Sequence, residues 1–342
     1  MMQIRLFGPF VAKFCTPGPI GPSFLSLFDE VFSRGAYESS KNQGEIKVSN
    51  RYYRYGSLSG INLANYSVDE LKALVRDILA KKIHGIAFSP YIEGQGPGTI
   101  ISEAQIRERL AVIQPYVNWV RSFSCTDGNE LIPKVASEMG LKTMVGVWLD
   151  GDHEHNQLEL NGALEVARAG HADLLAVGNE VLLRDEMSED ELIDYIMQAK
   201  AGAPGVPVGY EDAYFKFVNH PKVSDACDVI FANCYPYWEG YPAEHALVYM
   251  KEMYRRAVWA GKGKKVIISE TGWPNIGTPD RAAVPSFENA IRYFVNAYQW
   301  AEEEGIEIFY FSSFDETWKI EDEGDVGAYW GLWDKDGVLK YA

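Results

Sequence analysis

Two apolar runs in this chain each end in a glutamate, and this repeated plan restricts the possible folds more than any other feature of the sequence. One run, 266–268, reaches Glu270 and is then broken by a glycine and a proline. The other, 173–180, reads Asp-Leu-Leu-Ala-Val-Gly-Asn-Glu. Short apolar runs bounded by turn residues are typical of buried strands. Because the carboxyl ends of parallel strands meet at one edge, we expect Glu180 and Glu270 to share a site.

Strand-like and helix-like stretches alternate from residue 83 onward. The stretches with strand composition are 83–91, 119–123, 142–149, 173–181, 206–210, 228–235, 265–270 and 306–314. Helical periodicity is found in 103–113, 130–139, 158–169, 189–201, 214–218, 243–260 and 287–304. Two capping boxes, Ser67 with Glu70 and Ser188 with Glu191, predict helix starts.

This alternation predicts an α/β chain folded as a (β/α)8 TIM barrel. A doubly wound sheet usually has fewer strands, and no Gly-x-Gly-x-x-Gly phosphate loop follows the first strand. We expect a turn-rich N-terminal extension of uncertain order, 1–65, and a barrel domain, 66–342. The acidic, tryptophan-rich segment after Asp315 is expected over the barrel mouth and not in an eighth helix.

Composition limits the classes of partner. The net charge of −16 argues against nucleic acid, because phosphate backbones bind basic patches. A neutral ligand fits better, and the 9 Trp and 20 Tyr offer flat faces for sugar rings, although many must be core residues. No run is long enough to span a membrane. Pro9 and Lys13 interrupt the apolar start, so we expect no signal peptide and a cytoplasmic location, with secretion as the alternative if the start codon is misassigned.

The four cysteines, Cys15, Cys125, Cys227 and Cys234, are expected to be free thiols. Cys227 and Cys234 flank one predicted strand and would lie roughly 23 Å apart at about 3.3 Å per residue. That distance is beyond the reach of a disulfide. Free thiols favour a reducing compartment.

The acidic loop 150–156 invites a metal interpretation, because Asp150, Asp152 and Glu154 alternate along it. An EF-hand calcium loop needs glycine at its sixth position and glutamate at its twelfth, where this loop has His155 and Asn161. We therefore expect a solvated loop, with no metal and no cofactor.

Two glutamates at matched strand ends fit the chemistry of glycoside cleavage. One carboxylic acid protonates the departing oxygen, while the other carboxylate attacks the anomeric carbon or activates water. Each negative charge raises the pKa of the other group, so one stays protonated while its neighbour is ionised. For either glutamate alone, the alternative is a helix cap or a structural ion pair.

The chain resembles family 17 of the glycoside hydrolases, the β-1,3-glucanase-like enzymes. The motifs that carry the resemblance are Val-Gly-Asn-Glu-Val-Leu (177–182) and Ile-Ser-Glu-Thr-Gly-Trp-Pro (268–274). Three further motifs support it: Gly-Ile-Ala-Phe-Ser-Pro-Tyr (85–91), Ala-Asn-Cys-Tyr-Pro-Tyr (232–237) and Phe-Asp-Glu-Thr-Trp-Lys (314–319). The resemblance runs from about residue 83 to the C-terminus and leaves out residues 1–65.

The resemblance implies a (β/α)8 barrel and retaining cleavage of β-1,3-glucan or laminari-oligosaccharides. Glu180 matches the general acid/base of the family, and Glu270 matches its nucleophile. A retaining pair should stand about 5–5.5 Å apart. Asn179 matches the position that hydrogen-bonds the 2-hydroxyl of the sugar being cleaved.

Other residues are expected to line the substrate site. The Tyr235 hydroxyl is expected to orient Glu270. Trp273, Trp318 and Tyr237 are expected to form an aromatic platform for an acceptor sugar, against the alternative that they wall the barrel mouth. The remaining candidates for the cleft are Glu316, Lys319, Tyr91 and Arg121. For Glu316 and Lys319 the alternative is a solvated ion pair, which predicts the same spacing.

Three alternatives to simple hydrolysis remain. Transfer of the glycosyl group to a second sugar is the first, because either water or a sugar hydroxyl can accept it. A binding barrel without catalysis is the second, and the presence of both glutamates argues against it. The third is an unrelated barrel enzyme such as an aldolase, which would need a lysine on a strand tip in an apolar setting; the predicted strands show none.

Overall fold

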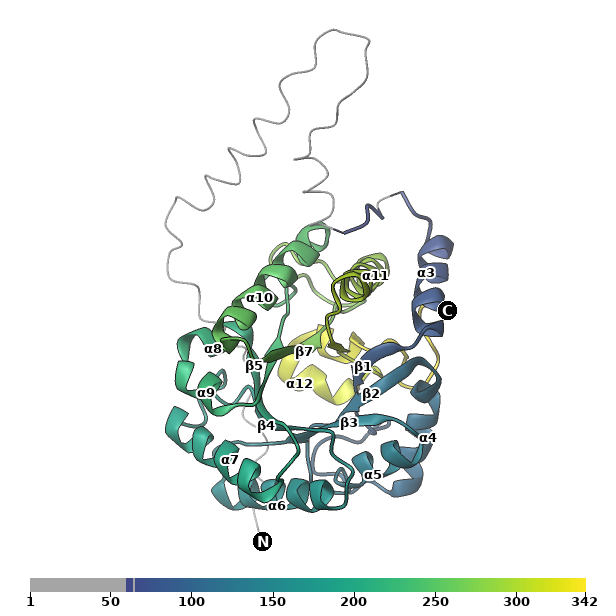
Figure 1. Ribbon diagram of the computed structural model, residues 1–342. Helices are drawn as coiled ribbons and strands as arrows, with labels where there is room; N and C mark the ends of the chain where they lie inside the picture. Colours follow the sequence, from purple (N-terminus) through teal and green to yellow (C-terminus); the bar gives the residue numbers. More distant parts are fainter. Residues whose placement is uncertain (1–59, 64) are drawn as a thin grey trace, which may run out of the picture.

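The computed structural model describes residues 60–63 and 65–342, and these fold into a closed barrel of parallel strands (Figure 1). Each strand pairs with the next in sequence, and β1 closes the barrel against β8. The strands are β1 (Ile83–Ala87), β2 (Val117–Arg121), β3 (Lys142–Val147), β4 (Leu174–Asn179), β5 (Val208–Ala213), β6 (Val229–Asn233), β7 (Lys265–Thr271) and β8 (Ile308–Tyr310). The predicted (β/α)8 barrel is confirmed.

Helices surround the barrel as an outer ring (Figure 1). They are α3 (Val68–Ala80), α4 (Glu103–Ile113), α5 (Leu131–Glu138), α6 (His153–Arg168), α7 (Glu189–Gly202), α8 (Tyr214–Asn219), α9 (Pro221–Ala226), α10 (Ala246–Gly261) and α11 (Phe287–Glu304). Short 3-10 turns precede β2 (η2, Gln114–Tyr116) and α10 (η3, Ala243–His245). Both predicted capping boxes are present, at the starts of α3 and α7.

The acidic loop departs from its prediction as a solvated loop, because its second half is the start of α6. The Asp152 carboxylate accepts the backbone N–H groups of Glu154 at 3.0 Å and His155 at 3.2 Å, and so caps the helix. Asp150 in turn accepts the N–H of Asp152 at 2.7 Å. The alternating acids therefore serve helix initiation, for which Asp is a favoured N-cap.

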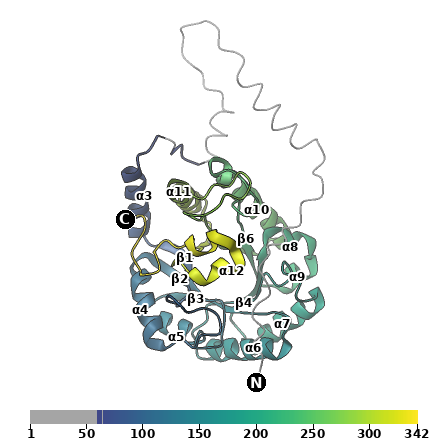
Figure 2. The ribbon, with the colours of Figure 1, turned by 180° about the vertical axis from the view of Figure 1, so that it is seen from behind.

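The chain after β8 forms no long helix and instead covers the barrel end. It contains η4 (Thr317–Lys319), α12 (Ile320–Glu323) and η5 (Gly324–Tyr329), and Figure 2 shows α12 in front of the strands. Hydrogen bonds from Thr278 to Asp325, at 2.7 and 3.0 Å, join this cap to the loop after β7. The predicted position of this segment is confirmed. Helix α3 lies beside α11 and takes the place of an eighth outer helix (Figure 1).

Buried apolar side chains fill the barrel interior, so the barrel is a packed core and not a pore. The inner cluster consists of Met144, Leu174, Ala176, Val229, Phe231, Ile267 and Phe309. The three described cysteines, Cys125, Cys227 and Cys234, are buried free thiols, as predicted, whereas Cys15 lies outside the described residues. The predicted extension, 1–65, also lies almost entirely outside them. Within the described chain, no helix is long and apolar enough to cross a membrane.

Candidate active site

Glu180 follows the last residue of β4 and takes up an unusual backbone conformation. Its φ is 53°, and two residues earlier Gly178 has a φ of 85°. The pairing register of β4 with β5 shifts between Ala176 and Asn179. Irregular strand ends of this kind redirect side chains. The partly buried Glu180 side chain is thereby directed toward the barrel mouth, where it meets a side chain from β6.

The Glu180 carboxylate accepts a hydrogen bond from Asn233 Nδ2 at 2.8 Å. Asn233 Oδ1 accepts one from Ser269 Oγ, also at 2.8 Å, so the orientation of the amide is set. Burial, followed by the negative charges of Glu270 and Asp212, raises the pKa of Glu180 to about 8. Glu180 is therefore protonated at neutral pH, which suits a general acid.

Glu270 belongs to β7, and its two carboxylate oxygens have different protein partners. Arg121 Nη1 donates to Oε1, and the Tyr235 hydroxyl donates to Oε2 at 2.8 Å. Only 6% of the residue is exposed. The β6–β7 register shifts immediately before Asn233 pairs with Glu270. These contacts hold the carboxylate in one orientation, as a nucleophile requires, and they place Tyr235 where the sequence predicts it.

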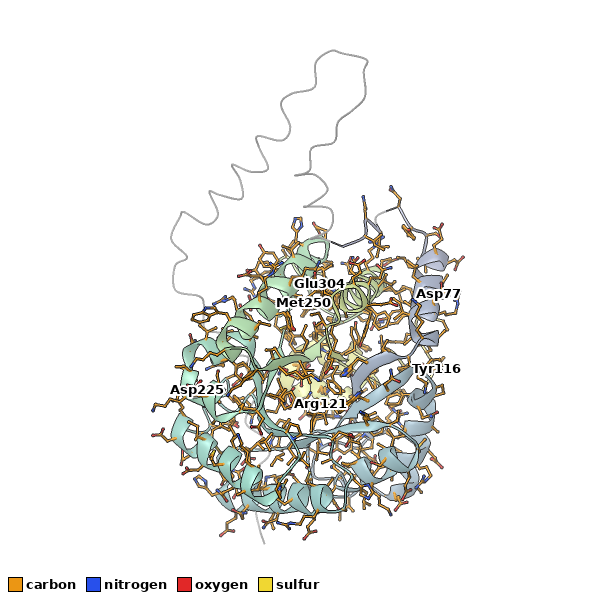
Figure 3. All side chains as sticks on the ribbon, in the orientation of Figure 1. Asp77, Tyr116, Arg121, Asp225, Met250 and Glu304 are labelled. Carbon is orange, nitrogen blue, oxygen red and sulfur yellow. The ribbon has the colours of Figure 1, made fainter. Side chains whose placement is uncertain are left out.

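Arg121 was expected to line a sugar subsite, and the structure corrects this prediction. The residue is 1% exposed and lies in the middle of the barrel (Figure 3). Its guanidinium bridges Glu270 and Glu211, with Nη2 2.6 Å from Glu211 Oε2, and it stacks over the Phe123 ring. Because its two terminal nitrogens each pair with a buried carboxylate, Arg121 orients Glu270 and does not line an open subsite.

Glu211 and Asp212 are the site residues that sequence reasoning missed. They lie at the end of β5, which was predicted to stop at residue 210 but continues to Ala213. Both side chains are buried. Burial raises the pKa of Glu211, and it raises that of Asp212 to about 6. Consecutive acids after an apolar run are the available signal, but acids are rare inside strands, and the predicted strand therefore ends before them.

Two of the predicted platform residues are part of the barrel wall. Trp273 is 1% exposed and Tyr237 is 0% exposed. The Trp273 indole N–H donates to the Val284 carbonyl at 3.0 Å, and the rings of Trp273 and Tyr237 pack edge to face. The prediction that they stack on sugar is therefore wrong, because their faces are covered by other side chains.

Trp318 and Tyr91 remain accessible at one side of the mouth. Their rings meet edge to face, and a hollow there is lined by Tyr91, Ile92, Glu93, Asp315, Glu316, Thr317, Trp318 and Lys335. The Trp318 indole donates to Glu316 at 3.0 Å, which fixes the ring. Binding sites for small molecules combine aromatic side chains with a few polar or charged groups, and this hollow has both. The hollow contains neither Glu180 nor Glu270. Its lining residue Glu316 pairs with Lys319, and the charge of Lys319 acts on Glu270.

Glu316 and Lys319 form a buried ion pair of 2.6 Å and not a solvated one. Burial alone would lower the pKa of Lys319, but the charges of Glu316 and Glu323 outweigh it and raise that pKa. Glu323 belongs to the cap, and burial together with the charges of Glu270 and Glu316 raises its pKa to about 7. Lys319 therefore offsets part of the negative charge around Glu270.

Asn179 lies beside Glu180 and keeps a free side-chain oxygen. Its Oδ1 is enclosed and has no hydrogen-bond partner, while its backbone carbonyl accepts from Arg184. An enclosed acceptor without a partner costs free energy that a ligand hydroxyl can recover. Among the residues that the structure describes, no group of three or more His, Cys, Asp or Glu is arranged to hold a metal ion.

The arrangement can carry out acid–base and nucleophilic chemistry with side chains alone. Glu180 carries a proton beside the Asn233 amide, and Glu270 is held by one donor from β2 and one from the loop after β6. A bond located between them would receive a proton on one side and a nucleophile on the other.

Comparisons with known proteins agree with this chemistry. The model of the BtgE/BtgC glycoside hydrolase domain matches residues 85–331. The chain is 30% identical over 251 residues to a glucan 1,3-beta-glucosidase of Schizosaccharomyces pombe, covering 67% of this chain and 77% of that protein. It also resembles the family 17 beta-1,3-glucanosyltransferase of Rhizomucor miehei, with a TM-score of 0.69, 30% identity and coverage of 76% and 96%. An active-site mutant of the latter was solved with laminaritriose.

Proposed function

The chain belongs to the BtgE/BtgC glycoside hydrolase domain family, within family 17 of the glycoside hydrolases, and on this premise we propose that it cleaves β-1,3-glucan by a retaining mechanism. Glu180 is the general acid/base and Glu270 is the nucleophile. The observation that carries this assignment is the difference between the two environments. Glu180 is a partly buried acid with a pKa raised to about 8, whereas Glu270 accepts from Arg121 and Tyr235.

In the first step, Glu180 donates its proton to the glycosidic oxygen while an oxygen of Glu270 bonds to the anomeric carbon. The carbon–oxygen bond to the leaving sugar breaks, and an ester joins the remaining sugar to Glu270. Asn179 supports this step if its free oxygen accepts the 2-hydroxyl, a contact that helps most when it tightens in the transition state.

In the second step, Glu180 acts as a base. Burial still raises its pKa, but esterified Glu270 is uncharged and no longer contributes to that rise. The ionised Glu180 takes a proton from water, whose oxygen displaces Glu270 from the anomeric carbon. The proton lost in the first step is thus regained, and the product keeps the β configuration.

The substrate is inferred from two relatives. One is named as a glucan 1,3-beta-glucosidase, and an active-site mutant of the other was solved with laminaritriose. The test is to incubate the protein with laminarin, and in parallel with a β-1,4-glucan, and to separate the products. We expect laminari-oligosaccharides from the first substrate alone, with the β-anomer formed first in proton NMR spectra. Absence of products from laminarin, or the α-anomer formed first, would overturn the proposal.

Glycosyl transfer is a second candidate, favoured by the name of the Rhizomucor relative. Because Trp273 and Tyr237 are buried, the predicted aromatic platform no longer supports it. Mass spectrometry of reactions with laminaripentaose distinguishes the two outcomes. Products longer than the pentaose at high substrate concentration indicate transfer, and shorter chains at every concentration indicate hydrolysis alone.

A further inference from the structure

Tyr210, Glu211 and Asp212 precede the last residue of β5, and two of them contact the segment that carries Glu180. Tyr210 and Asp212 lie two residues apart on one face of the strand, and the Tyr210 hydroxyl donates to the Asp212 carboxylate. The other Asp212 oxygen accepts the N–H of Ala213 at 2.7 Å. The buried Asp212 is thus held by two donors, which is the usual condition for burying a carboxylate.

The same strand holds the backbone on both sides of Glu180. The N–H of Glu180 donates to the Glu211 carbonyl at 2.8 Å, and the N–H of Leu182 donates to the Tyr210 hydroxyl at 3.0 Å. The Tyr210 ring also packs against Gly178 at close range. Glu180 has a positive φ, a conformation that is costly outside glycine and persists only where its surroundings impose it. Tyr210 and the β5 backbone impose it here.

Charge links the same groups. The charged and titratable groups facing Glu180 include Glu270, Asp212, Arg184, Glu211 and Tyr235. Those facing Asp212 include Tyr210, Lys216, Arg184 and Glu180 itself. Burial raises the pKa of both carboxyls, to about 6 for Asp212 and about 8 for Glu180, so Asp212 ionises first as the pH rises. When two neighbouring carboxyl groups have well-separated pKa values, one of them can stay protonated while the other is ionised.

We propose that Asp212 is a positioning residue for Glu180: through Tyr210 it holds the turn from Glu180 to Leu182, and its negative charge adds to that of Glu270 in favouring the protonated form of Glu180. This inference rests on the proposed role of Glu180 as the acid/base. Asp212 does not contact the substrate, because it is buried.

The first test compares the pH profile of kcat/KM in Asp212→Asn and in Asp225→Asn. The control removes one negative charge from the outer edge of the molecule, where Asp225 pairs with Lys262 (Figure 3). We expect Asp212→Asn to move the alkaline limb of this profile, its upper limb, toward lower pH by about one unit. Asp225→Asn should leave that limb in place. An upper limb that stays in place in Asp212→Asn would refute the electrostatic part of the proposal.

The second test addresses geometry with Tyr210→Phe, which removes the hydroxyl shared by Leu182 and Asp212. We expect kcat to fall about tenfold with little change in KM, since a misplaced acid slows the chemical step. An unchanged kcat would show that the hydroxyl does not position Glu180.

A third measurement needs no variant and no activity. A carbon-13 titration of the full chain, with labelled Asp and Glu carboxyls, should show Asp212 ionising at lower pH than Glu180. The reverse order would overturn the proposal even if the variants fail to fold. Because this readout is independent of catalysis, inactivity on glucan would count against the proposed function and leave the titration order as a separate result.

Discussion

Asn233 is the last residue of β6, Tyr235 follows it by two residues, and the two side chains hold different glutamates of the proposed catalytic pair. Asn233 donates to Glu180 and Tyr235 donates to Glu270, each at 2.8 Å. The end of β6 and the residues directly after it therefore set the position of Glu180 relative to Glu270.

Substitution of Asn233 tests this relationship. The Asn233 hydrogen bond acts against the burial that raises the pKa of Glu180. Asn233→Ala should therefore raise that pKa further, move the upper limb of the pH profile to higher pH, and lower kcat by about tenfold. Steady-state kinetics across pH check both effects, with the exposed Asn161→Ala on α6 as the control. A shift to lower pH would contradict the assigned contact.

Removal of each catalytic carboxylate should have distinct consequences. Glu180→Gln and Glu270→Gln should each reduce kcat by about 100-fold or more, while circular dichroism remains that of the parent. With azide and an activated aryl glycoside, Glu270→Ala should yield an α-glycosyl azide and Glu180→Ala a β-glycosyl azide, because only Glu270→Ala lacks the covalent nucleophile. The opposite products would exchange the two roles.

The activity should follow a bell-shaped pH profile, because one carboxyl must be protonated and the other ionised. The pKa of Glu180, raised to about 8, predicts loss of kcat/KM as the pH rises through about 8. Initial rates on laminari-oligosaccharides between pH 4 and pH 10 measure this limb. A carbon-13 titration that finds Glu180 ionised in the free protein at pH 4 would refute the assignment.

The same pKa shift predicts an effect on stability. Between the ordinary pKa of a glutamate and about 8, the unfolded chain releases a proton that folded Glu180 retains, so stability falls as the pH rises through this window. Glu180→Gln removes the effect. The Tm of this variant minus that of the parent should increase from pH 4.5 to pH 8, whereas the exposed Glu165→Gln should show no such trend.

Trp318, the accessible tryptophan at the barrel mouth, should contribute to substrate binding. Trp318→Ala should raise KM several-fold with a smaller effect on kcat, because it removes a ring at the rim of the hollow and no reacting group. Trp259→Ala is the matched control, since this tryptophan is 74% exposed on α10 in the outer ring. Equal effects from the two substitutions would exclude a sugar contact at Trp318.

The sequence by itself determined the barrel and the two strand ends at which catalysis is proposed. Alternation of apolar strands and periodic helices depends on neighbours a few residues apart, and so it can be read locally. The limits of α4 and α11 agree with the predicted stretches to the residue. Glu180 and Glu270 were found for the same reason, because each directly follows or ends an apolar run.

Only the tertiary structure decided what surrounds those glutamates. Arg121 and Glu270 are separated by 149 positions, and no local pattern reports that they touch. Whether an aromatic at a strand end faces the mouth or the wall depends on packing from other segments, which buries Trp273 and leaves Trp318 accessible. Asp212 influences Glu180 for the same reason. Closure of the barrel brings the buried charge of Asp212 beside Glu180, and a nearby negative charge favours the protonated form of a carboxyl group.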